Sequence, residues 1–119
     1  MPDADTLVVE IVTGARAGER LSLRLPCTVG RAADAGLALP DAHLSTHHGV
    51  LEGTGEALRY ADRGSSNGSI HLRDGVITEL REDCLEAELW DGDELHLGDP
   101  NEPVVLRVHV AEAEGGNVV

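Results

Sequence analysis

Three short polar segments of this chain carry side chains that are suited to holding a phosphate group. They are residues 30–31 (GR), 45–48 (STHH) and 62–68 (DRGSSNG). An arginine guanidinium offers a planar fork of donors with a permanent charge, and serine hydroxyls and an asparagine amide add further hydrogen bonds. Taken singly, each segment is also typical of an ordinary surface turn. On converging loops, however, these groups would make a site for a dianionic phosphate and the peptide attached to it.

The segments between these motifs have the composition of β-strands. Residues 7–12 are apolar and β-branched, residues 21–25 alternate with period two, and Asp74-Gly75 is a strong hairpin signal. Similar short apolar segments occupy residues 27–29, 37–39, 48–52, 57–62, 69–72, 76–78, 94–97 and 104–110. This pattern predicts an all-β fold, an antiparallel β-sandwich of about ten or eleven short strands, with ligand loops at one end.

One stretch does not fit a single element. Residues 78–89 are acidic with scattered leucines, a pattern that fits a helical turn, a loop or an irregular strand. The whole chain of 119 residues is long enough for one core. We expect a flexible segment at residues 1–6, one domain at residues 7–110 and a flexible tail at residues 111–119.

The charge of the chain excludes two classes of partner. Its 22 acidic residues exceed its 9 basic ones, all of which are arginine, and the formal net charge is −13. A nucleic-acid-binding protein needs a basic stripe, so nucleic acids and anionic membranes are poor partners. A phosphate ligand is still compatible, because charges beyond about 8 Å are largely screened at physiological salt. Each hydrogen bond to a charged group contributes about 1.5–3 kcal/mol locally.

The three polar segments, each following a predicted strand, resemble in order and spacing those of the forkhead-associated (FHA) domain, a phosphothreonine-binding module. Residues 14–18, with a glycine at each end, residues 39–41 (LPD) and residues 91–98 (DGDELHLG) agree with the same family. The resemblance covers residues 7–110 and implies the β-sandwich of the SMAD/FHA type.

The resemblance also implies which residues bind the phosphopeptide. Arg31 matches the arginine that contacts the phosphate, and Ser45 matches the serine whose hydroxyl donates to a phosphate oxygen. Thr46 follows that serine at a further contact position. Ser66 adds a hydroxyl or backbone donor, and Asn67 matches the asparagine that pairs with the ligand's backbone.

Other matched positions are implied to support the site or to tune it. Gly30 and Gly68 are positions of special backbone conformation, and His48 matches a structural histidine that ties the loops together. His43 and Arg63 are candidates for specificity, because they could favour an acidic residue three positions after the phosphothreonine.

Thr46 is a departure from the family pattern. The family commonly has arginine, lysine or asparagine at this position, whereas threonine brings no charge. We therefore expect weaker phosphate affinity than in an arginine-bearing relative, with compensation from His43, His47 or Arg63.

Catalysis and metal binding are the rival interpretations of the same residues. Ser45, His48 and Asp62 could form a nucleophile, a base and an orienting acid, but no Gly-x-Ser-x-Gly elbow is present. His43 and His47 have an i, i+4 spacing that suits metal binding only on a helix, and this stretch has the composition of a loop. We therefore expect no enzyme, no cofactor and no metal site.

The expected partner is a phosphothreonine-containing protein or peptide, the substrate of a serine/threonine kinase. No apolar run approaches the roughly 20 residues that span a bilayer, and residues 1–6 lack a basic start. We expect a bacterial, cytoplasmic signalling or scaffold module. The alternative is an FHA-fold interaction module that works independently of phosphate, or a part of a larger secretion or regulatory assembly.

Cys27 and Cys84 leave two interpretations open. They could form a disulfide or redox pair, or they could be two small residues of the core. Intracellular disulfides are uncommon, which favours the second interpretation.

Overall fold

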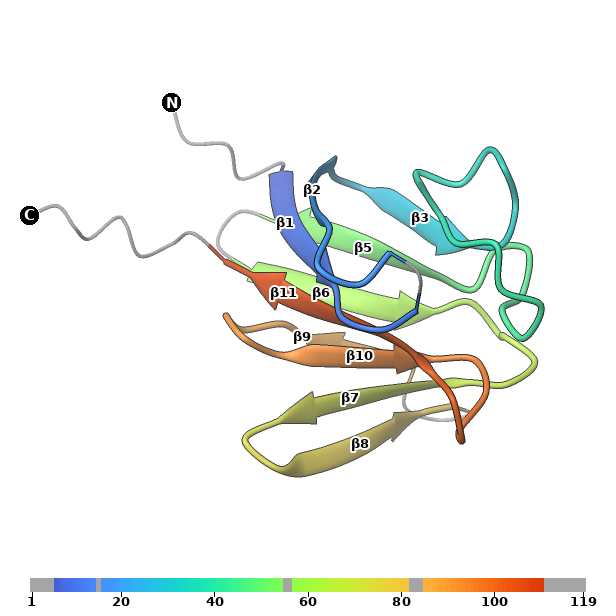
Figure 1. Ribbon diagram of the computed structural model, residues 1–119. Helices are drawn as coiled ribbons and strands as arrows, with labels where there is room; N and C mark the ends of the chain where they lie inside the picture. Colours follow the sequence, from blue (N-terminus) through green and yellow to red (C-terminus); the bar gives the residue numbers. More distant parts are fainter. Residues whose placement is uncertain (1–5, 15, 55–56, 82–84, 111–119) are drawn as a thin grey trace, which may run out of the picture.

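The chain folds into two β-sheets packed face to face, as the computed structural model shows for residues 6–14, 16–54, 57–81 and 85–110 (Figure 1). The strands are β1 (Thr6–Ile11), β2 (Arg20–Arg24), β3 (Cys27–Gly30), β4 (Leu37–Ala38), β5 (Gly49–Thr54), β6 (Ala57–Asp62), β7 (Ser69–Arg73), β8 (Val76–Leu80), β9 (Glu86–Glu88), β10 (Glu94–Leu97) and β11 (Val104–His109). One sheet has the order β2-β1-β11-β10-β7-β8, and the other has the order β4-β3-β5-β6-β9. The predicted all-β sandwich is therefore confirmed.

Alternation along the strands places aliphatic side chains between the sheets. In β1, for example, Leu7, Val9 and Ile11 are buried while the residues between them are half-buried. Burying a side chain of this kind stabilises the fold by about 1.5–3 kcal/mol. Tyr60 is the largest fully buried side chain among the described residues, in a core otherwise built mainly of leucine and valine.

The strand predictions hold to within one or two residues at most boundaries. β1 begins at Thr6, one residue before the predicted start of the domain. The ambiguous stretch contains the end of β8 and then β9, a three-residue edge strand that pairs with β6. One pairing departs from the antiparallel expectation, since β3 and β4 run parallel. The buried Cys27 thiol belongs to the core, and Cys84 lies outside the described residues.

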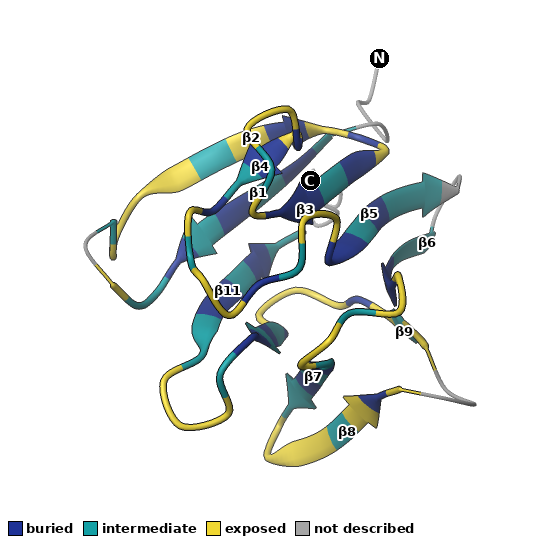
Figure 2. Cartoon of the chain, turned by 90° about the vertical axis from the view of Figure 1, so that its right-hand side faces the viewer, coloured by how far each residue is buried: buried dark blue, intermediate teal, exposed yellow. Residues whose placement is uncertain are grey.

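The antiparallel pairing brings the three polar segments to one end of the sandwich. β3 ends there at Gly30, β5 begins there at Gly49, and the β6–β7 loop turns there between Asp62 and Ser69. Figure 2 views the molecule onto this end, where long exposed loops connect the strands. No described segment is a helix that could cross a membrane.

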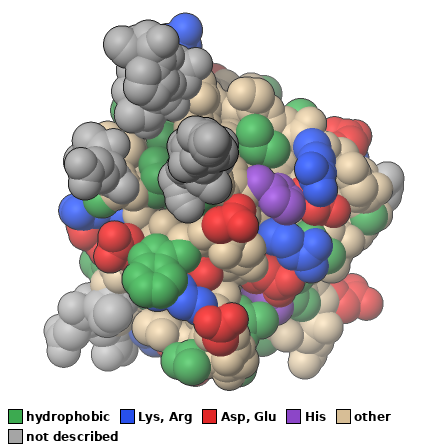
Figure 3. Space-filling view, turned by 90° about the vertical axis from the view of Figure 1, so that its left-hand side faces the viewer, with side chains coloured by type: hydrophobic (Ala, Val, Ile, Leu, Met, Phe, Trp, Pro, Cys, Tyr) green, Lys and Arg blue, Asp and Glu red, His purple; other side chains and the backbone are tan. Residues whose placement is uncertain are grey.

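The opposite end carries charges of both signs. Figure 3 shows basic side chains interspersed with acidic and hydrophobic ones there, without a continuous basic stripe on this face.

A buried carboxylate organises part of the sheet. Asp93 is 2% exposed and accepts hydrogen bonds from His71 Nε2 at 2.8 Å, Arg73 Nη2 at 2.8 Å and the Trp90 backbone N–H at 2.8 Å. The Arg73 guanidinium also lies 4.0 Å from the centre of the Trp90 ring.

These contacts predict a pH-dependent contribution to stability. Burial raises the pKa of the Asp93 carboxyl, but hydrogen bonds from Arg73, Trp90 and His71 outweigh it, so the pKa lies below its usual value. Because the pKa of Asp93 is lower in the folded chain than in the unfolded chain, the carboxylate stabilises the fold fully at pH values above its unfolded-state pKa of about 4. This stabilisation is lost as the pH falls through the folded-state pKa.

Asp93→Asn is therefore expected to lower the free energy of unfolding by about 1–3 kcal/mol near neutral pH. The difference from the wild type should shrink as the pH falls below about 4, because protonation removes the same charge from the wild type. Urea unfolding of both proteins at about pH 7, 5 and 3 measures this. A difference that stayed constant down to the lowest pH would contradict the assignment.

Candidate functional site

Arg31 stands at the rim of the loop end, directly after β3. The backbone at Gly30 lies so close to the β4–β5 loop (residues 39–48) that a side-chain carbon there would overlap the Thr46 carbonyl oxygen. The Arg31 backbone N–H donates to the Ser45 carbonyl oxygen at 3.0 Å, and its Nε donates to the Leu44 carbonyl oxygen at 3.1 Å. Its two terminal nitrogens have no recorded hydrogen bond to any described residue. The guanidinium is thus held against the loop that carries Ser45, with its outer donors available to a ligand.

His48 connects the β4–β5 loop to the β6–β7 loop (residues 63–68). The side chain is completely buried. The Ser45 backbone N–H donates to Nδ1 at 3.1 Å, so Nδ1 carries no proton, and Nε2 therefore donates to the Gly68 carbonyl oxygen at 2.8 Å. Gly68 has a φ of +79°, a conformation that glycine adopts without strain. Both ring nitrogens hold backbone groups, one in each loop.

Two further contacts hold the loop tips together. The Ser66 backbone N–H donates to the Ser45 hydroxyl oxygen at 3.0 Å, and Asn67 Nδ2 donates to the His43 carbonyl oxygen at 2.7 Å. Ser66 and Asn67 are exposed, and Ser45 is half-buried. The structure therefore brings Arg31, Ser45, Ser66 and Asn67 together at one rim, within a connected set of loop contacts.

The β6–β7 loop is held from within by a buried carboxylate. Asp62 accepts hydrogen bonds from the Ser65 backbone N–H at 2.8 Å, the Ser65 hydroxyl at 2.6 Å and the Ser69 hydroxyl at 2.6 Å. Since Ser69 donates its only hydroxyl hydrogen to Asp62, the Tyr60 hydroxyl is the donor in the 2.9 Å contact between Tyr60 and Ser69. Burial raises the pKa of Tyr60, so its hydroxyl keeps that hydrogen. The loop shape thus depends on groups that lie beneath the rim.

The remaining predicted residues lie around this rim without joining its hydrogen bonds through their side chains. His43 lies 3.4 Å from Asp41 through Nδ1, and His47 lies 3.7 Å from Asp34, with both histidine side chains 57% exposed. Thr46 is exposed and accepts from a backbone N–H through its carbonyl oxygen. For Arg63 the structure records a backbone bond to His48 and no side-chain hydrogen bond or ion pair with a described residue.

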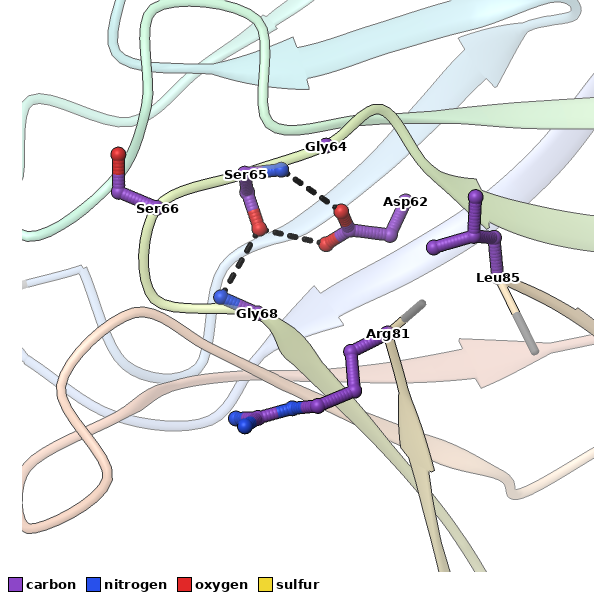
Figure 4. Close-up of a pocket in the computed structure, with 7 residues that line it drawn as sticks. All are labelled: Asp62, Gly64, Ser65, Ser66, Gly68, Arg81 and Leu85. Carbon is purple, nitrogen blue, oxygen red and sulfur yellow. Dashed lines mark hydrogen bonds between the residues drawn. The ribbon is translucent and has the colours of Figure 1, made fainter. Parts of the chain in front are cut away.

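Arg81 directly follows β8 and belongs to none of the three polar segments that the sequence pattern marks as a candidate site. Figure 4 shows its side chain extending beneath the β6–β7 loop, past Gly68. Together with Leu85 and that loop it lines a hollow of about 260 Å³. A charged residue after a hairpin strand is common in sequences, so only the packing of β8 beside β7 identifies this position.

Metal binding has no matching geometry in the part of the chain that the structure describes. No three histidine, cysteine, aspartate or glutamate side chains gather there in a way that could hold a metal ion.

The sequence of this chain matches a known domain family. The family model of the FHA domain matches residues 27–98. The FHA domain-containing protein FhaB of Mycolicibacterium smegmatis is 38% identical over 72 residues, which make up 60% of this chain and 46% of that relative. The chain thus matches less than half the length of this curated relative.

Solved structures give the same result. A domain from a structural and functional analysis of phosphothreonine-dependent FHA domain interactions superposes with a TM-score of 0.68 and 26% identity, covering 88% of this chain and 96% of that one. The FhaA FHA domain in complex with the intracellular domain of another protein superposes with a TM-score of 0.67 and 26% identity, covering 87% and 99%.

Proposed function

Because this chain belongs to the FHA domain family, we propose that it binds phosphothreonine-containing segments of other proteins, as a signalling or scaffold module. The observation that carries the proposal is the position of Arg31. Its Nε is fixed by the carbonyl oxygen of Leu44, the residue before Ser45, and its terminal nitrogens have no recorded hydrogen bond to a described residue. The loop that fixes it is in turn joined to the tip that carries Ser66 and Asn67. The likeness to a domain from a study of phosphothreonine-dependent interactions supports the same ligand class.

Three of the four rim residues have separate tasks toward the ligand in this proposal. Arg31 pairs with the phosphate through charge-assisted hydrogen bonds, the strongest type available here. Ser45 donates its hydroxyl hydrogen to a phosphate oxygen, because that hydroxyl uses only its oxygen in the contact with Ser66. Asn67 uses one amide hydrogen toward His43, which leaves its second hydrogen and its carbonyl oxygen for the backbone of an extended peptide.

Thr46 makes the phosphate contact weaker than in a relative with a basic residue there. A hydroxyl adds a hydrogen bond without charge, and His47 beside it is already near Asp34. His43 and Arg63 lie next to the rim and are our candidates for reading residues that flank the phosphothreonine.

We further infer that the rim is a binding site rather than a hydrolytic centre. His48 receives the backbone N–H of Ser45, not its hydroxyl, and its other nitrogen is occupied by Gly68. A general base needs a free nitrogen within hydrogen-bond reach of the nucleophile. Asp62 is engaged by Ser65 and Ser69 at the same time.

Titration with matched peptides tests the proposal. A phosphothreonine peptide library and its unphosphorylated twin are titrated against the chain and followed by fluorescence anisotropy. We expect measurable binding for phosphorylated peptides and at least tenfold weaker binding for their twins, since a single charge-assisted bond contributes about 1.5–3 kcal/mol. Equal binding of both forms would instead establish the phosphate-independent interaction module.

We define the proposed natural partner by its chemistry. It is a protein phosphorylated on threonine by a serine/threonine kinase, and this chain binds it in the cytoplasm. A pull-down from lysate with and without phosphatase treatment would identify it, because only the untreated lysate should yield the partner.

A further inference from the structure

A hollow lies between the β6–β7 loop and Arg81 (Figure 4). The hollow of about 260 Å³ there is lined by Asp62, Gly64, Ser65, Ser66, Gly68, Arg81 and Leu85. Ser66 belongs both to this lining and to the candidate phosphate rim, where its N–H meets Ser45. A peptide held at the rim therefore passes next to the hollow.

Arg81 supplies a positive charge at this place. A carbon placed on Gly68 would lie 3.4 Å from Arg81 Nη2, so the guanidinium lies against the loop that carries Ser66. Its ion pair with Glu79 is loose, at 3.6 Å, with the two side chains 60% and 62% exposed. A pair of this kind contributes little, about 0–1 kcal/mol, so Arg81 can exchange Glu79 for a ligand group at small cost.

Asp62, the other charged residue among the described residues of the lining, does not oppose an anion strongly. The Asp62 carboxylate already accepts three hydrogen bonds, from the Ser65 N–H, the Ser65 hydroxyl and the Ser69 hydroxyl. Its side chain is 2% exposed and points toward Ser65 in Figure 4, while Arg81 extends along the opposite side of the hollow.

The shape and the apolar wall narrow the choice of ligand. Gly64 and Gly68 bring no side chains into the hollow, and a carbon added at Gly64 would meet nothing within 4 Å. Leu85 is 36% exposed, and its position is fixed because its carbonyl oxygen accepts the Asp62 backbone N–H at 2.8 Å. An acidic side chain with a methylene stem can contact Leu85 while its carboxylate reaches Arg81.

We propose that this hollow is a specificity pocket for an acidic residue, glutamate above all, that flanks the phosphothreonine in the bound peptide. The inference rests on the proposed phosphopeptide function and adds Arg81 as its specificity residue. In a chain of net charge −13, a local cation is what allows an acidic flank to be favoured over a neutral one. The recognition is electrostatic and exposed, and it therefore weakens as salt rises.

A glutamate scan tests this pocket. A single glutamate is moved through the positions before and after phosphothreonine in an alanine background, and the Kd of each peptide is measured with the full chain. We expect glutamate at one position to raise affinity about threefold to fivefold over alanine, the range of an exposed ion pair. The gain should shrink when salt is raised from about 0.05 M to 0.5 M.

Charge reversal identifies the residue responsible. Arg81→Glu should abolish the preference for glutamate and favour lysine at the same position, and Arg81→Gln should make the scan flat there. The matched control is Arg24→Glu, which changes the net charge equally. Arg24 is an exposed arginine on β2, at the opposite edge of the sheet and at its other end. It should keep the wild-type preference.

The outcomes separate this inference from the proposed function. Phosphate-dependent binding with a flat wild-type scan, or with a glutamate preference that survives Arg81→Glu, would overturn the pocket and leave the function standing. Equal binding of phosphorylated and unphosphorylated peptides would overturn both.

Discussion

Arg31→Ala is expected to weaken phosphopeptide binding by about 2–4 kcal/mol, or roughly 30-fold to 1,000-fold in Kd. The substitution removes a permanent charge and two terminal nitrogens that have no recorded hydrogen bond or ion pair with the described part of the chain. The fold should change little, since Arg31 is exposed and loses only its hydrogen bond to Leu44, worth about 1 kcal/mol. Isothermal titration of variant and wild type with one phosphorylated peptide measures the loss.

Two comparisons make this prediction specific. Arg31→Lys keeps the charge but not the planar fork, and binding should fall between wild type and the alanine variant. Arg24→Ala removes an exposed arginine at the far end of the sandwich and should leave binding unchanged. If Arg31→Ala unfolded the domain, or lowered binding of the unphosphorylated twin by the same factor, the guanidinium would not be a phosphate contact.

His48→Ala is expected to damage both stability and binding. The fully buried ring holds the Ser45 N–H and the Gly68 carbonyl oxygen, and its loss leaves both groups without partners around a cavity. A fully buried unpaired group costs about 1–3 kcal/mol, and these two groups are half-buried; with the cavity added, the free energy of unfolding should fall by about 3–5 kcal/mol. Urea unfolding measures the loss, and peptide titration of the fraction that remains folded measures the effect on binding.

His47→Ala is the matched control for this variant. His47 is the adjacent histidine, 57% exposed, with Asp34 at 3.7 Å as its recorded ion-pair partner. Its removal should change the free energy of unfolding by no more than about 0.5 kcal/mol. Comparable losses from both variants would mean that His48 does not have the connecting position that its hydrogen bonds indicate.

The sequence could predict the sandwich and most of its strands for a local reason. Period-two alternation, β-branched residues and turn pairs such as Asp74-Gly75 act within a few residues, and β7 and β8 form on either side of that pair. β9 could not be predicted in the same way. Two of its three residues are glutamates and the third is alanine, none of them a β-former, and they become a strand only because β6 offers an unpaired edge.

The residue types at the candidate site could also be predicted from the sequence, because Arg31, Ser45 and Asn67 stand in three segments of characteristic composition and order. The contacts between these segments could not be predicted. The contact of Ser66 with Ser45 joins residues 21 apart, and that of Asn67 with His43 joins residues 24 apart. Such contacts depend on how the strands pair, which no local pattern encodes.

The amino-acid sequence by itself determined the β-sandwich class and the chemical groups available for an anion. Both follow from side-chain type and short-range periodicity. The tertiary structure alone decided that the Arg31 guanidinium is anchored through Nε, that the two ring nitrogens of His48 hold the Ser45 N–H and the Gly68 carbonyl oxygen, and that Arg81 lies beneath the β6–β7 loop. These features come from the antiparallel register, which carries residues distant in the chain to the same end of the molecule.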